Sequence, residues 1–339
     1  MILPAISFDH LVALSSPLGL YEHAELAIPR LEHGFCLDDV ARGLVVTSRQ
    51  PEPSPRVREL TTAYLRFVVL AQDRHGAFRN RRSHDGSWQD RPSCGDHWGR
   101  AIWALGTAAA ETDDDQVRST ALETLAIALR ARSPWPRAMA YAALGAGELL
   151  RVRPDDPAAL ALLKAARVTV GRPAADPLWP WPERRLTYAN AVLPEAMVVI
   201  GVALADVSAI RDGMGLLRWL LAIESHDGRL SVTPAGGWQI GEPRSGLDQQ
   251  PIEVAALAEA CWRAFVLTEN ESWLEAVRRA AGWFTGSNDA GLALYDPQTG
   301  GGFDGLHADA VNLNQGAEST LAALSTLQIA LRAAPVGAS

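Results

Sequence analysis

The chain is poor in cysteine and has no concentrated positive charge. Its 339 residues include three cysteines, Cys36, Cys94 and Cys261, which form neither a CxxC pair nor a zinc-finger spacing. So sparse and odd a count argues against a disulfide framework and suits a reducing compartment. The formal net charge is −8 and no basic cluster stands out. Because phosphate-backbone binding requires such a cluster, we expect no nucleic-acid partner.

Long apolar runs are also missing. Residues 1–20 are mildly apolar, but they lack a basic start and contain Asp9 and His10, so they do not resemble a signal peptide. No run is long enough to span a bilayer. We therefore expect a cytoplasmic protein that does not insert into membranes.

Several motifs that would define a chemistry are absent. The sequence has no GxGxxG opening a βαβ unit, no P-loop, no HExxH and no GxSxG. The histidines are scattered without the spacing of a zinc site. These absences lead us to expect neither a cofactor nor a bound metal.

The pattern that dominates the chain is helical. Hydrophobic residues make up 48% and charged residues 21%, as in a globular protein with a large core. Apolar residues recur at i, i+3, i+4 and i+7. This period predicts helices over residues 38–48, 55–72, 97–110, 115–131, 136–152, 157–170, 190–203, 208–224, 251–267, 271–284 and 315–332, with one more in the first thirty residues.

These helices alternate between two kinds of connection. One set follows long loops rich in Gly, Trp, Asp and His, and the other follows short, plain connections. Three of the long loops, 74–106, 225–258 and 287–324, resemble one another: each has a turn signal, alternating residues, and then GSWQ, GGWQ or GGFD. A repeat of this kind predicts an all-α fold of six helical hairpins, an (α/α)6 toroid with short β-hairpins in the loops before its inner helices. We expect one domain over residues 1–335, followed by a disordered tail at 336–339.

In such a ring the N-termini of parallel inner helices meet at one end. Their unpaired N–H groups and positive dipole ends favour carboxylates and polar ligands there. Carboxylates that flank a bond and aromatic rings that stack on a sugar are what a carbohydrate site needs. The catalytic candidates are Asp39, Asp96 and Asp248. The candidates for substrate binding are Asp38, Trp88, Trp98, Arg100, Trp181, Glu183, Tyr188, Gln249, Gln250, Asp304, His307, Asn312 and Gln315. Simple helix capping is the competing explanation for the aspartates.

Five segments together resemble a known group of proteins. They are HGFCLDDVARGL (33–44), GRAIWALG (99–106), WPERRLTYANAVLPEA (181–196), LDQQPIEVAAL (247–257) and FDGLHADAVNLNQGAEST (303–320). The set is similar to α/α-toroid proteins that occur beside, or fused to, bacterial glycosyltransferases and mannoside-active enzymes. The resemblance implies a sugar-related role and a glycosyltransferase partner. Val40 and Ala189 depart from the pattern, where Asn and Asp are commoner, and a changed Asp bears on whether activity is retained.

Three functions follow from these residues. The first is a glycoside hydrolase, in which two carboxylates act as acid and as base or nucleophile on an oligosaccharide. The second is a sugar epimerase or isomerase that uses His97 and His307 as bases. The third is a non-catalytic glycan-binding or scaffold toroid. A terpene-cyclase-like toroid is a remote fourth, because the Asn/Gln-rich loops suit a hydrocarbon poorly.

Overall fold

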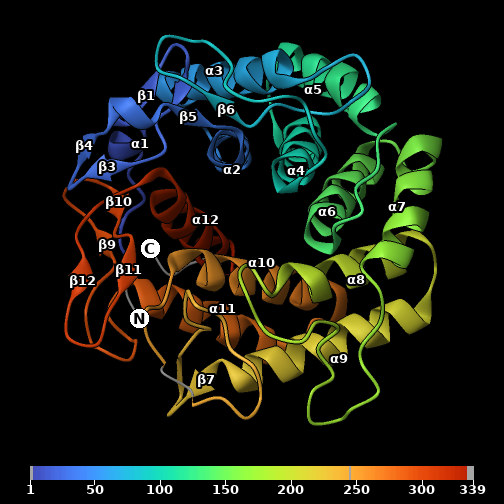
Figure 1. Ribbon diagram of the computed structural model, residues 1–339, viewed down its shortest axis with the longest axis vertical. Helices are drawn as coiled ribbons and strands as arrows, with labels where there is room; N and C mark the ends of the chain where they lie inside the picture. Colours follow the sequence, from blue (N-terminus) through green and yellow to red (C-terminus); the bar gives the residue numbers. More distant parts are fainter. Residues whose placement is uncertain (1–2, 244–245, 334–339) are drawn as a thin grey trace.

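The computed structural model describes residues 3–243 and 246–333, and within these ranges its α-helices form a double ring (Figure 1). The inner helices are α2 (Leu37–Ser48), α4 (Asp96–Glu111), α6 (Pro136–Val152), α8 (Val192–Ala203), α10 (Pro251–Thr268) and α12 (Ala317–Arg332). The outer helices are α3 (Pro55–Ala71), α5 (Asp115–Ala128), α7 (Pro157–Thr169), α9 (Val207–Ile223) and α11 (Glu271–Phe284). The expected tail at 336–339 lies outside the described residues.

The inner ring is closed. Each inner helix contacts the next, and α12 returns to α2. The short helix α1 (Asp9–Ala13) packs against α12 and α3, so the N-terminal segment covers the point where the ring closes. The prediction of an (α/α)6 toroid is therefore confirmed, including the alternation of inner and outer helices.

The two sets of helices begin differently. Outer helices are capped by their own N-cap side chains, which accept backbone N–H groups of the first turn: Ser54, Asp114, Asp156, Asp206 and Asn270. For the inner helices of the described ring, no N-cap residue makes such a bond. Asp38 and Asp39 follow the N-cap of α2, and Asp96 follows the N-cap of α4. Helix capping therefore does not explain these aspartates.

Short antiparallel strand pairs occupy the loops before inner helices. All three loops expected to form hairpins do so. The loops before α10 and α12 form strand pairs of their own, and in the first loop Arg82 forms an antiparallel bridge with Trp88 while residues 81–82 also pair with the segment before α2. The pairs are β1 (Ser15–Ser16) with β2 (Gly19–Leu20), β3 (Ala24–Glu25) with β4 (Ile28–Pro29), β5 (Phe35–Cys36) with β6 (Arg81–Arg82), β7 (Ser225–His226) with β8 (Arg229–Leu230), β9 (Tyr295–Asp296) with β10 (Gly301–Gly302), and β11 (Gly305–Leu306) with β12 (Val311–Asn312).

Helices α4 and α6 approach so closely that only glycine fits between them. A Cβ at Gly99 would lie 2.2 Å from the carbonyl oxygen of Ala138. One at Gly145 would lie 2.2 Å from that of Ile102, and one at Gly106 would lie 2.2 Å from that of Gly145. The backbone of the facing helix cannot move aside for an added Cβ as a flexible side chain could. These glycines therefore set the spacing between α4 and α6.

Replacing Gly145 by alanine is expected to lower the free energy of unfolding by about 1–3 kcal/mol, the usual effect of overpacking. The matched control is Gly215→Ala in α9, where a Cβ meets nothing within 4 Å. That change should raise stability by about 0.5–1 kcal/mol, because alanine favours a helix. Denaturant unfolding of both variants measures the difference. Equal stability of the two would contradict the close packing of α4 on α6.

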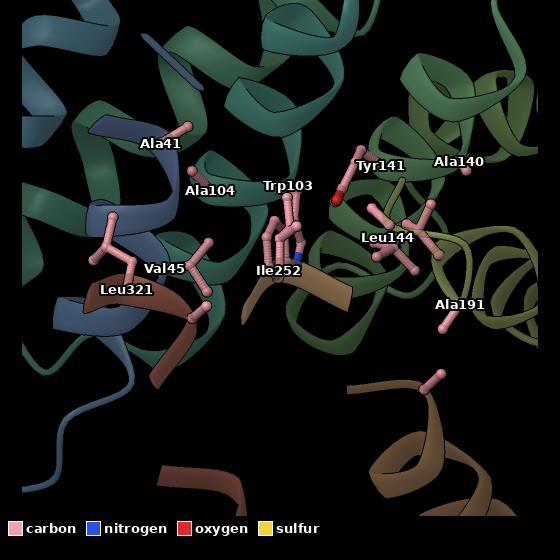
Figure 2. Close-up of a cluster of buried hydrophobic side chains, with 14 of the residues drawn as sticks. Ala41, Val45, Trp103, Ala104, Ala140, Tyr141, Leu144, Ala191, Ile252 and Leu321 are labelled. Atoms are coloured by element: carbon pink, nitrogen blue, oxygen red, sulfur yellow. The ribbon is translucent and has the colours of Figure 1, made fainter. Parts of the chain in front are cut away.

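The axis of the ring is filled by apolar side chains. Figure 2 shows Val45, Trp103, Tyr141, Ile252 and Leu321 converging from α2, α4, α6, α10 and α12. They leave a space of only about 50 Å³ between them. The middle of the toroid is thus narrow and mostly apolar. Among the described residues, no helix combines the length and apolarity needed to cross a membrane.

Candidate active site

A polar cavity of about 630 Å³ lies at the end of the ring where the inner helices begin. It shares Arg42, Ile252 and Glu318 with the apolar space along the axis, which adjoins it. Among the described lining residues there is one phenol, Tyr188, and one imidazole, His23. The charged lining consists of carboxylates and guanidinium groups: Glu22, Asp38, Asp39, Asp96, Asp304 and Glu318, with Arg42, Arg81 and Arg100.

The cavity brings together about half of the residues that the sequence pattern selected. They come from the starts of inner helices and from the loops before them, as the ring geometry requires. Those that line it are Asp38, Asp39, Asp96, Arg100, Tyr188, Gln250, Asp304 and Asn312.

The selected tryptophans lie elsewhere, in apolar packing. Trp98 is fully buried and Trp181 nearly so, its ring stacked 6.1 Å from that of Trp219. Trp88 packs edge-on against Phe67 at 5.3 Å. Large aromatic side chains bury more apolar area in the core than at a polar rim. None of the three lines the cavity within the described structure.

Five polar candidates also lie outside the cavity lining, each bonded to another partner. Asp248 pairs with His307 at 2.5 Å, and both side chains are exposed. Glu183 accepts a hydrogen bond of 2.8 Å from Arg137. The buried Gln249 accepts a hydrogen bond from the Trp283 indole at 2.9 Å, and the side-chain oxygen of Gln315 accepts one from the Thr299 hydroxyl at 2.8 Å. The two glutamines therefore hold loops together, and Asp248 lies outside the cavity that contains Asp39 and Asp96.

Asp38 and Asp39 adjoin in sequence but have opposite electrostatic surroundings. Successive helix residues point about 100° apart, so the two carboxylates meet different neighbours. Burial opposes ionisation of Asp38, but Arg100, which forms an ion pair with it, and Arg42 outweigh burial and lower its pKa to about 2. Burial raises the pKa of Asp39 to about 7, although Arg42 donates to it at 2.8 Å. Near neutral pH, Asp38 is therefore ionised, while Asp39 is present in both its protonated and its ionised form.

Asp96 and Tyr188 form a second polar pair in the cavity. The Tyr188 hydroxyl donates to a carboxylate oxygen of Asp96. Burial, and then the bond to Asp96, raise the pKa of Tyr188 above its ordinary value, so the phenol stays protonated and remains a donor. Beneath its ring lies the Arg137 guanidinium, 4.9 Å from the ring centroid. This places a braced aromatic ring beside a carboxylate, a combination suited to contact with a sugar.

Sequence reasoning missed several residues of the site. Arg42 bridges Asp39 and Glu318, at 2.8 and 2.7 Å. Its position three residues after Asp39 on one helix was an available signal, because such pairs share a face. Glu22 enters from the N-terminal segment, where it pairs with Arg81. Nothing local in the sequence marks Glu22, since only the closure of the ring brings it to the cavity.

Three possible metal-ligand atoms also meet here. The Glu22, Cys36 and Asp39 atoms lie within 4.8 Å of one another. Burial, and then the neighbouring aspartates, raise the pKa of the Cys36 thiol well above its ordinary value.

Both positions that depart from the resemblance are buried. Val40 lies in the apolar core. Ala189 adopts a left-handed backbone conformation with φ 44°, unusual for a residue other than glycine. Ala189, which stands where an Asp is commoner, therefore lies in the turn that carries the cavity residue Tyr188.

Comparison with known proteins identifies the fold. No family model matches the chain, and neither does any curated protein sequence. Cellobiose 2-epimerase from Bacillus thermoamylovorans is similar in structure at 13% identity, with 96% of each chain covered and a TM-score of 0.70. An inactive variant of an α-1,6-mannanase from Salegentibacter sp., with two consecutive aspartates replaced by asparagine and α-1,6-mannotriose bound, is 10% identical, covers 96% of each chain and has a TM-score of 0.65. The cellulase Cel9M of C. cellulolyticium, in complex with cellobiose, is 9% identical, with 93% of this chain and 87% of that chain covered and a TM-score of 0.62. At such identities the likeness establishes the (α/α)6 toroid alone.

Proposed function

We propose that this protein is a carbohydrate-active enzyme that hydrolyses a glycosidic bond, with Asp39 as general acid and Asp38 as its ionised partner. One observation carries the proposal: two carboxylates in one cavity have pKa values pushed apart, to about 2 and about 7. Glycoside hydrolysis needs one carboxylic acid to protonate the leaving oxygen and one carboxylate to stabilise or attack the positive sugar carbon. Asp39 and Asp38 suit these two roles.

The remaining cavity residues suit the binding of a sugar. Asp96, Asp304, Gln250 and Asn312 provide hydrogen-bonding oxygens and amides around the carboxylates. Among the structural neighbours, the mannanase variant with two consecutive aspartates replaced is described as inactive, and it binds α-1,6-mannotriose. We therefore propose an oligosaccharide substrate. A glycosyltransferase partner remains a prediction from the sequence resemblance.

Epimerisation is the second candidate, because a cellobiose 2-epimerase shares the fold. Proton abstraction at a sugar carbon suits histidine bases. The two histidines expected for it lie elsewhere. His97 is buried and bonds to the Phe78 carbonyl at 3.0 Å, and His307 pairs with Asp248. Of the described lining residues, only His23 is a histidine. The carboxylates therefore favour hydrolysis.

Product analysis separates the two activities. The protein is incubated with cellobiose and with α-1,6-mannotriose, and the sugars are resolved by anion-exchange chromatography. Hydrolysis should release shorter saccharides from at least one of a panel of neutral oligosaccharides that includes these two. A product of unchanged length with a new reducing-end sugar would establish epimerisation instead. If thermal shift detects sugar binding without any product, the protein is a glycan-binding toroid.

A further inference from the structure

A buried carboxylate on α10 contacts the turn that carries Tyr188. Glu253 lies in the first turn of α10, is 3% exposed, and is absent from the cavity lining. Its carboxylate crosses to the start of the neighbouring helix α8. There it accepts the backbone N–H of Ala189, and the backbone and side-chain N–H groups of Asn190 at 3.2 and 3.0 Å. Glu253 thus acts on a helix other than its own.

The turn held by Glu253 is unusual. Ala189 has φ 44°, a region that favours glycine, so surrounding contacts must hold the turn in place. The side-chain oxygen of Asn190 accepts the N–H of Thr187 at 3.0 Å and a guanidinium N–H of Arg137 at 3.3 Å. These bonds join α6, the turn and α10 in one buried network.

Tyr188 lies in the middle of that turn. Its carbonyl oxygen accepts from Arg137 Nε at 2.7 Å, and its hydroxyl donates to Asp96 at the start of α4. The Tyr188 side chain is 41% exposed, and the Arg137 guanidinium lies against its ring, 4.9 Å from the centroid. The backbone of the turn, which Glu253 and Arg137 hold, therefore determines the point from which the phenol reaches Asp96.

We propose that Glu253 is a positioning residue: by holding the turn at residues 187–190, it keeps the Tyr188 hydroxyl on Asp96 and so sets the orientation of Asp96 in the cavity. The effect of Glu253 on catalysis rests on the proposed function. The hydrogen bonds that hold the turn and Tyr188 do not depend on it. In Glu253→Gln an NH2 group replaces one carboxyl oxygen, so at least one of these buried N–H groups loses its acceptor. The left-handed turn then relaxes and Tyr188 moves away from Asp96.

The first test is the hydrogen bond itself, measured independently of activity. The chain has five tyrosines, so tyrosine labelled with ¹³C at Cζ gives a simple spectrum, and Tyr188→Phe assigns the Tyr188 signal. Asp96→Asn shows how that signal moves when the carboxylate is lost. Glu253→Gln should move the Tyr188 signal in the same direction and leave the other four in place. Glu259→Gln, another buried carboxylate on α10 that bonds to Arg49 and Ser325, is the matched control and should leave Tyr188 unmoved.

The second test is a double-mutant cycle on kcat/KM. Glu253→Gln alone should lower kcat/KM by about ten- to a hundred-fold, as a displaced group in an active site does. In a Tyr188→Phe background it should add little, because two residues that act through one interaction are not additive. A purely structural role would give additive effects and would overturn the proposal.

The outcomes also separate this inference from the proposed function. An unmoved Tyr188 signal in a folded Glu253→Gln variant rejects the positioning role, whatever the enzyme hydrolyses. A moved signal in a protein that cleaves no sugar supports the positioning role and rejects hydrolysis. If Glu253→Gln does not fold, Glu253→Asp keeps both oxygens on a shorter side chain, and the same displacement of the Tyr188 signal is required.

Discussion

Replacing Asp39 by asparagine will lower kcat for a natural oligosaccharide by about 10²–10⁴-fold, the usual contribution of a general acid. Asparagine has nearly the same shape and still accepts the hydrogen bond from Arg42, but it cannot give a proton to the leaving oxygen. Sugar binding should therefore survive, and the thermal shift caused by substrate should remain. Steady-state kinetics with natural and aryl glycosides provides the measurement. The loss should be much smaller for an aryl glycoside with an acidic leaving group, which departs without protonation.

The pH profile gives the same assignment a second test. The pKa of Asp39 is about 7 because its carboxyl is buried, and a general acid works only while protonated. In the free enzyme kcat/KM should therefore fall about tenfold per pH unit above roughly pH 7, and that limb should vanish in Asp39→Asn. Asp38, with a pKa of about 2, stays ionised over this range. Asp113→Asn removes an exposed carboxylate paired with Arg58 and should leave the profile unchanged. Retention of the limb in Asp39→Asn would move the acid role to another carboxylate, with Asp96 the next candidate.

The ring itself was predictable, because helix periodicity and loop length are local properties. Apolar spacing located the helices, and the alternation of long and short connections separated inner from outer ones. Misplaced boundaries have physical reasons that the local sequence does not contain. Helix α8 begins two residues after its predicted start because Ala189 adopts a left-handed conformation and Asn190 bonds across to α10. That conformation depends on Glu253, which is more than sixty residues away.

The site was most predictable at the starts of the inner helices, where the ring geometry fixes the position of the side chains. Asp38, Asp39 and Asp96 open inner helices, so the fold alone brings them to one end. Loop residues such as Trp88 and Asp248 lack that constraint, and packing or a surface ion pair places them elsewhere. An aromatic ring and a carboxylate suggested contact with a sugar, but the type of a residue does not determine where its side chain points.

The other end of the toroid carries a charged network that the proposed chemistry does not use. A cavity of about 500 Å³ opens there, lined by Arg49, Glu148, Glu259 and Arg263 among others. Arg263 bridges two buried carboxylates, Glu195 and Glu148, each at 2.9 Å. Burial opposes ionisation of Glu148, but Arg263 and its other partners outweigh burial and lower its pKa to about 2. At Glu195 burial also opposes ionisation, but there it outweighs Arg263, so the pKa of Glu195 is raised.

Replacing Arg263 by methionine should therefore lower the free energy of unfolding by about 3–5 kcal/mol at pH 7.5, the usual result of breaking a buried ion pair on one side. The loss arises because Glu195 stays buried without its ion-pair partner, while Glu148 keeps only its contacts with Arg151 and Arg49. Denaturant unfolding measures it. Arg278→Met removes an exposed arginine that pairs with Glu275 on the surface of α11, and should change stability by no more than about 0.5 kcal/mol.

The pH dependence of that loss identifies its cause. In the wild type the folded-state pKa of Glu148 lies below its ordinary 4.5, so the group adds stability above pH 4.5 that is lost as pH falls toward 2. The folded-state pKa of Glu195 is already raised in the wild type, and without Arg263 burial should raise it further and should also raise the pKa of Glu148. The variant would then gain stability as pH falls, and the difference from the wild type should shrink between pH 7.5 and pH 5. Adding Glu195→Gln to Arg263→Met should recover part of the loss at pH 7.5, because one uncompensated charge is removed. A loss that is independent of pH and unaffected by this second change would mean that Arg263 contributes through packing of its aliphatic stem, not through its charge.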